Sequence, residues 1–146
     1  MINTVELQKR ISTTNDAGLI AMLLERLIDN FNNCILKMET KEYHKVNELN
    51  NHSRAILTEL LVQFSGDDEI SLSLREINLY VNTLMTKGEN DKDSLIFETC
   101  IHILTPLLEG FKELELQEKP KVVAGLTYGK NNLGEYELRG NKSFEG

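Results

Sequence analysis

Apolar residues repeat at steps of three and four residues in four blocks within residues 15–116, and short polar segments separate the blocks. This spacing places the apolar side chains of each block on one face of an α-helix. The four stripes cover residues 19–38, 43–64, 70–85 and 95–114. The pattern predicts an all-α protein, an antiparallel four-helix bundle whose stripes face a common core that includes Leu57 and Leu104.

The polar segments predict the turns between these helices. Residues 40–42 separate the first two blocks, and residues 65–68 separate the second from the third. Gly66 is predicted to end a helix in the left-handed conformation, and Asp67 or Asp68 is predicted to cap the next helix. The wholly polar residues 89–93 are predicted as the last connection, and the fourth helix is predicted to begin near Ser94. Such short connections make each helix run back along its predecessor, in up-down-up-down order.

Three further segments complete the predicted organisation. Residues 5–11 are predicted to form a short helix that caps one end of the bundle, because one or two turns persist only when packed. Pro106 lies inside the fourth block, where a missing donor and a crowded carbonyl predict a bend that either wraps the helix around the core or opens a groove. Residues 1–118 form the helical domain, and residues 119–146 form a tail that is too rich in glycine for a helix.

Charge differs between these two parts. The chain carries a net charge of −7, the tail has five basic residues against three acidic ones, and residues 1–118 therefore carry −9. An acidic bundle repels phosphate backbones, so nucleic acid is not an expected partner. The chain has neither a signal-like N-terminus nor an uninterrupted apolar run long enough to insert in a membrane, which favours a cytoplasmic location.

The sequence offers few groups for chemistry. His44, Glu48 and His52 follow one another at four-residue spacing and share a helix face that a zinc ion would suit, although the same residues also fit a solvated face. Cys34 and Cys100 stand apart in apolar blocks, as buried thiols do. Nucleophile-elbow, phosphate-loop and Cys-x-x-Cys motifs are missing. We therefore expect no enzyme, no cofactor and no resident metal.

The segment Ser12-Thr13-Thr14-Asn15-Asp16 and the Met22-Leu23-Leu24 that follows resemble the opening of the FliS family, the flagellin export chaperones. The turn Gly66-Asp67-Asp68-Glu69-Ile70 is similar to that family's Gly-Gly-Glu-Ile turn, and Leu104, Leu107 and Phe111 are similar to its final helix. Several positions depart from the pattern. Leu24 stands in place of a tyrosine, Phe111 stands in place of a tryptophan, and Ile77-Asn78-Leu79-Tyr80 keeps only the second ring of a Leu-Tyr-x-Tyr motif. A tyrosine and an asparagine that precede the family's first helix would fall near Glu6 and Lys9.

The resemblance implies a cytoplasmic chaperone that binds the C-terminal segment of flagellin, or of a related exported filament protein. Such a chaperone prevents premature polymerisation and assists delivery to the flagellar type III export apparatus. An amphipathic client would lay its apolar face on the bundle. The residues predicted to bind it are Ile11, Leu24, Ile77, Tyr80, Val81 and Leu84.

Two other function classes stay open: a divergent helical interaction or regulatory module with a non-flagellin partner, and a metal-dependent enzyme centred on His44, Glu48 and His52. The tail is predicted either to cover an end of the bundle or to act as a substitute client. A substitute client would occupy the binding site of its own chain or reach a neighbour and form a homodimer.

Overall fold

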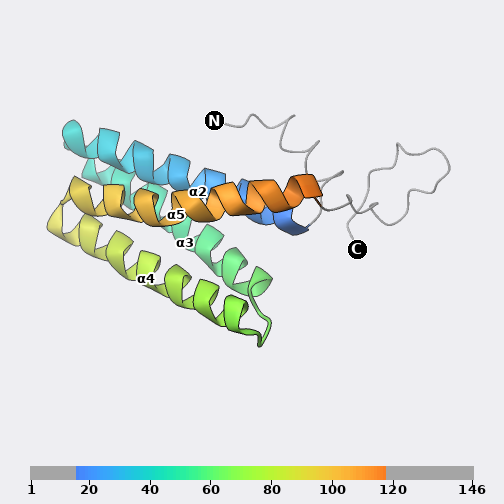
Figure 1. Ribbon diagram of the computed structural model, residues 1–146. Helices are drawn as coiled ribbons and strands as arrows, with labels where there is room; N and C mark the ends of the chain where they lie inside the picture. Colours follow the sequence, from blue (N-terminus) through green and yellow to red (C-terminus); the bar gives the residue numbers. More distant parts are fainter. Residues whose placement is uncertain (1–15, 118–146) are drawn as a thin grey trace, which may run out of the picture. The chain divides into compact units, whose positions relative to one another are not determined.

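The computed structural model describes residues 16–117, and these residues form four α-helices, labelled in Figure 1. They are α2 (Asp16–Glu39), α3 (Tyr43–Gln63), α4 (Glu69–Asp91) and α5 (Ser94–Gln117). The predicted turn at residues 40–42 and the predicted helix start at Ser94 are confirmed. The predicted short helix at residues 5–11 and the tail at residues 119–146 lie outside the described residues.

The described residues belong to two compact units. One unit is residues 23–107, which hold α3 and α4 whole and most of α2 and α5. The other contains residues 16–22 at the start of α2 and residues 108–117 at the end of α5. The packing described below is that of residues 23–107.

Side-chain contacts connect the four helices. The Asn30 amide of α2 donates a hydrogen bond of 3.1 Å to Ser53 of α3. Helices α3 and α4 lie side by side in Figure 1, and the Asn78 amide of α4 donates to the Leu57 carbonyl of α3 at 3.1 Å. Helices α2 and α5 are joined by an aromatic contact, in which the ring centroids of Phe31 and Phe97 lie 5.8 Å apart. The predicted four-helix bundle is confirmed.

The core follows the predicted stripes in most places. Leu57 and Leu104 are 4% and 2% exposed, as predicted. Phe97 is fully buried although the predicted stripe passed through Leu95, which is 65% exposed. Ile70 was also predicted to face inward and is 71% exposed in the first turn of α4. The largest fully buried apolar side chains are those of Phe31, Phe97, Leu24, Leu27, Leu60, Met85, Val46 and Val81.

The turn from α3 to α4 differs from the prediction at its glycine. Helix α3 is closed by Phe64 with φ −98°, and Gly66 does not adopt the left-handed conformation. The Arg75 guanidinium donates hydrogen bonds to the carbonyls of Phe64 and Gly66, which satisfies the end of α3 without a left-handed residue. Asp68 caps α4 as predicted, by accepting from the Ser71 amide at 3.1 Å.

The last connection is shorter than predicted, because α4 continues through Gly88 to Asp91. Gly88 is buried against α5, where a Cβ atom would lie 3.1 Å from a ring carbon of Phe97 and 3.3 Å from Ile96. Lys92 takes the left-handed conformation, with φ 54°, and closes the helix instead. The predicted connection at residues 89–93 was therefore wrong for residues 89–91, which belong to α4. Gly88 does not end the helix, because its missing side chain allows α4 to pack closely against α5.

Two glycine substitutions in helices should have opposite effects on stability. Gly88→Ala forces the α4–α5 contact apart and should lower the free energy of unfolding by about 1 kcal/mol. Gly110→Ala meets no atom within 4 Å. It should raise the free energy of unfolding by about 0.5–1 kcal/mol, because alanine has the higher helix propensity. Urea unfolding followed by circular dichroism measures both, and a stabilised Gly88→Ala variant would contradict the packing described above.

Helix α5 continues without interruption through Pro106. The helix therefore tolerates the proline in its interior, and its last turns extend to Gln117. Among residues 16–117, α5 is also the helix that is long and apolar enough to cross a membrane by length and composition. A core helix of a soluble protein passes the same test.

Candidate functional site

An apolar surface lies on one side of α4. Ile77, Tyr80 and Leu84 are spaced at three and four residues, so they share a flank of the helix. Ile77 and Leu84 are half-buried, and the Tyr80 side chain is 55% exposed. We call Ile77, Tyr80 and Leu84 the α4 flank. Leu79 and Leu72 add exposed apolar area elsewhere on the same helix, at 56% and 47%.

Polar contacts to α3 fix which side of α4 carries this flank. Asn78 donates to the carbonyl of Leu57, and Arg54 of α3 donates to Thr86 Oγ1 at 3.2 Å. Glu89 accepts from two α3 asparagines. Asn78, Thr86 and Glu89 therefore lie on the side of α4 that faces α3. With α4 rotated in this way about its own axis, the α4 flank lies on another side of the helix. The apolar pattern did not identify Asn78 as an inward-facing residue. The signal that could have identified it is its position three residues before Val81, which places both residues on the same buried face of α4.

The structure places the six predicted client-binding residues in different surroundings. Ile77, Tyr80 and Leu84 lie together on the α4 flank. Leu24 and Val81 are 1% and 0% exposed and belong to the core, so they have no surface to offer a client. Their apolar character serves packing because both lie on inward faces of their helices. Ile11 lies outside the described residues.

Helix α5 also exposes apolar area. Only 17% of the most apolar 18-residue window of α5 is buried. Leu95, the second residue of α5, is 65% exposed. Contiguous apolar side chains on a protein surface commonly mark an interaction site. The α4 flank and α5 are therefore the described surfaces best suited to an apolar partner.

Comparison with known families matches residues 1–118 to the model of the FliS family, described as flagellar protein FliS. The chain belongs to the FliS family. The match contains all four described helices and ends at the predicted boundary between the bundle and the tail. Membership makes this a flagellar chaperone-type protein, with a role in flagellar export. No curated protein matches the chain significantly.

The possible zinc ligands of this FliS-family chain do not converge. His44 Nε2 lies 3.1 Å from Glu48 Oε2, and both side chains are exposed. His52 has its Nδ1 atom 2.9 Å from the Asn30 amide nitrogen, so that ring nitrogen is already engaged. Within residues 16–117, no three His, Cys, Asp or Glu side chains are arranged to hold a metal ion. Nothing in this part of the chain favours the metal-dependent enzyme.

Both cysteines are buried, as predicted. Burial raises the pKa of the Cys34 thiol to about 12, with a smaller contribution from the charge of Glu89. Burial likewise raises the pKa of Cys100 to about 12. A thiol that stays protonated at neutral pH is a poor nucleophile, so the two cysteines act here as packing residues.

Proposed function

We propose that this protein is a cytoplasmic export chaperone that binds the C-terminal segment of flagellin, or of a related exported filament protein. The observation that carries the proposal is the apolar α4 flank exposed on a bundle of the FliS family. By holding the client, the chaperone prevents premature polymerisation and assists transfer to the flagellar type III export apparatus.

The physical basis is burial of apolar surface on both partners. A client segment that forms an amphipathic helix has an apolar face that water disfavours. Ile77 and Leu84 offer partly exposed aliphatic area, and Tyr80 offers a ring with a polar end. Aromatic residues of this kind often carry a large share of binding energy. Leu95 of α5 is a further exposed apolar side chain.

The charge of the chain is compatible with this role. Residues 1–118 carry a net charge of −9, which keeps the bundle soluble while its apolar flank is unoccupied. The same charge disfavours nucleic acid as a partner. Binding and release of a client on such a surface require no catalytic group and no cofactor.

Isothermal titration with the C-terminal segment of flagellin from the same cell tests the proposal. The unaltered chain should bind with a negative heat-capacity change, because apolar surface is buried. Tyr80→Asp places a charge in that surface and should raise Kd about tenfold or more. Thr58→Asp adds the same charge at an exposed position of α3 and should leave Kd nearly unchanged.

The outcomes separate the available readings. No binding of the flagellin segment by the unaltered chain would exclude this client and favour an interaction module with another partner. Binding that Tyr80→Asp leaves intact would place the client away from the α4 flank. Circular dichroism of both variants establishes that each retains its helices.

The tail gives a further prediction. Residues 119–146 carry +2 and scattered apolar residues, opposite in charge to the bundle. If the tail occupies the client site, removing residues 120–146 frees that site and lowers Kd for the flagellin segment. Titration of the full and shortened chains, with the particle mass measured for both, tests this. Equal affinities and equal masses would exclude the substitute-client role and the dimer.

A further inference from the structure

The α4 flank is bordered by carboxylates on its outer side. Glu69, Glu76 and Tyr80 follow one another at steps of seven and four residues, which places both carboxylates and the ring on one strip of the helix surface. Glu76 is exposed and lies one helical turn before Tyr80, so the two side chains are neighbours on that surface. The solvent-facing edge of the apolar flank therefore carries negative charge.

The cations of α4 do not neutralise this edge. Arg75 donates to two carbonyls at the end of α3, and Lys87 Nζ lies 2.7 Å from Asp91 Oδ2. Residues 94–107 of α5 contain no lysine or arginine. Within residues 16–117, no ion pair or side-chain hydrogen bond engages either glutamate of the edge. Both carboxylates are therefore available to a partner.

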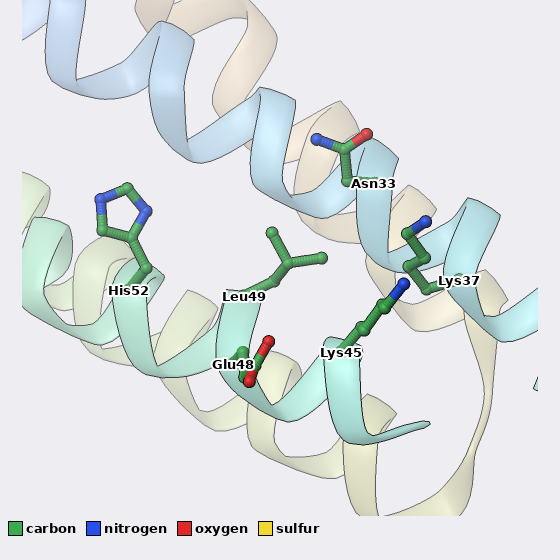
Figure 2. A pocket seen from close by; sticks show the side chains of 6 residues that line it. All are labelled: Asn33, Lys37, Lys45, Glu48, Leu49 and His52. Carbon is green, nitrogen blue, oxygen red and sulfur yellow. The ribbon is translucent and has the colours of Figure 1, made fainter. Parts of the chain in front are cut away.

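The hollow between α2 and α3 has no such imbalance. It holds about 390 Å³, and Figure 2 shows Lys37 of α2 and Lys45 of α3 at one end, with Glu48 also in the lining. Lys45 Nζ lies 2.9 Å from Glu42 Oε1, and Lys37 Nζ lies 3.8 Å from Glu42 Oε2. Two cations face two carboxylates, so the hollow selects no charge in an occupant, whereas the edge of the α4 flank does.

We propose that Glu76 and Tyr80 bind an arginine or lysine side chain of the client, so that the α4 flank selects amphipathic segments with a basic residue at the edge of their apolar face. This inference rests on the proposed function, because it concerns the same site. A cation is attracted to the carboxylate by a charge-assisted hydrogen bond and to the ring by a cation–π contact. The methylene groups of a long basic side chain extend the apolar contact.

The charge of the bundle acts in the same direction. Residues 1–118 carry a net charge of −9, which attracts a basic segment at long range and speeds its encounter with the chain. Glu76 differs from this general attraction in its position, because it determines where the basic residue lies relative to the ring of Tyr80. An acidic segment is repelled both by the bundle and at this edge.

The test uses the full chain and two capped amphipathic peptides of about 18 residues that share one leucine face. One peptide carries arginine along both edges of that face, and the other carries glutamate. Fluorescence anisotropy measures Kd for each. The arginine peptide should bind the unaltered chain about tenfold or more tightly than the glutamate peptide. Added salt should reduce this difference.

Charge reversal at two positions separates Glu76 from the general charge. Glu76→Lys should weaken binding of the arginine peptide about fivefold and strengthen binding of the glutamate peptide. Glu59→Lys makes the same change of net charge at an exposed position of α3 and should change either Kd by less than about twofold. Tyr80→Leu keeps an apolar side chain without the ring and should reduce the preference for arginine. Circular dichroism establishes that each variant retains its helices.

Equal effects of Glu76→Lys and Glu59→Lys would overturn the proposal, because they would show that only the overall charge matters. Equal affinities of the two peptides for the unaltered chain would overturn it as well. So would a particle mass that is twice that of one chain without peptide and falls to one chain in Glu76→Lys, since a second copy would then occupy the flank.

Titration with the C-terminal segment of flagellin separates this proposal from the function on which it rests. If that segment binds the unaltered chain and Glu76→Lys equally well, the charge selection is wrong and the proposed function stands. If the segment does not bind at all while the peptides respond to the charge at residue 76, the client is wrong and the charge selection of the flank stands.

Discussion

Phe97→Ala should lower the free energy of unfolding by about 3–5 kcal/mol, the largest effect of any change considered for this protein. The side chain is fully buried, lies against the ring of Phe31 and covers Gly88 of α4. Its removal leaves a cavity where α2, α4 and α5 meet. The loss combines the hydrophobic transfer energy of the ring with the cost of unfilled space.

Urea unfolding followed by far-ultraviolet circular dichroism measures the effect, with Leu95→Ala as the control. Leu95 lies two residues away in the same helix and is 65% exposed, so its truncation should change stability by less than about 0.5 kcal/mol. If Phe97→Ala does not fold at 25 °C, Phe97→Leu provides a smaller cavity to measure. Equal losses of unfolding free energy for Phe97→Ala and Leu95→Ala would show that α5 does not turn Phe97 inward and Leu95 outward as described.

Asn50→Ala should lower the free energy of unfolding by about 2–3 kcal/mol, the second largest effect. Asn50 is fully buried and connects three helices: its carbonyl accepts from the Cys34 thiol at 3.4 Å, and its amide donates to Glu89 at 2.9 Å. The Glu89 side chain is 20% exposed. Losing this donor leaves a partly buried carboxylate short of a hydrogen bond, and such losses are costly.

Asn47→Ala is the matched control, because Asn47 donates to the same carboxylate at 2.7 Å from an exposed position. Water replaces that donor, so the change should be within about 0.5 kcal/mol. A double-mutant cycle of Asn50→Ala with Glu89→Gln isolates the interaction between the two residues. Equal losses for Asn47→Ala and Asn50→Ala would show that burial does not govern this contact.

The sequence by itself determined how many helices residues 16–117 form and where most of them end. Periodic apolar residues and short polar segments are local signals, and they located the turn at residues 40–42, the Asp68 cap and the start of α5 at Ser94. The resemblance of the turn and final helix also led to the family that the comparison then established. These features depend on neighbours within a few positions, which a single sequence records.

The tertiary structure decided the phase of each helix. Leu95, Ile96 and Phe97 are consecutive apolar residues, and periodicity alone does not say which of them points inward. Contact with Phe31 and Gly88 selects Phe97. In α4, Asn78 and the other polar contacts to α3 bury Val81 and leave Tyr80 outside, although the sequence suggested both for the client.

The structure also decided features that need two helices at once. Gly88 continues α4 because the surface of α5 fills the space a side chain would need, so a residue that commonly ends helices lies inside one. Lys37 and Lys45 line the same hollow between α2 and α3 because the two helices run antiparallel and bring residues eight positions apart to the same end. A sequence determines local periodicity and caps, whereas burial and surface shape follow from which faces pack together in three dimensions.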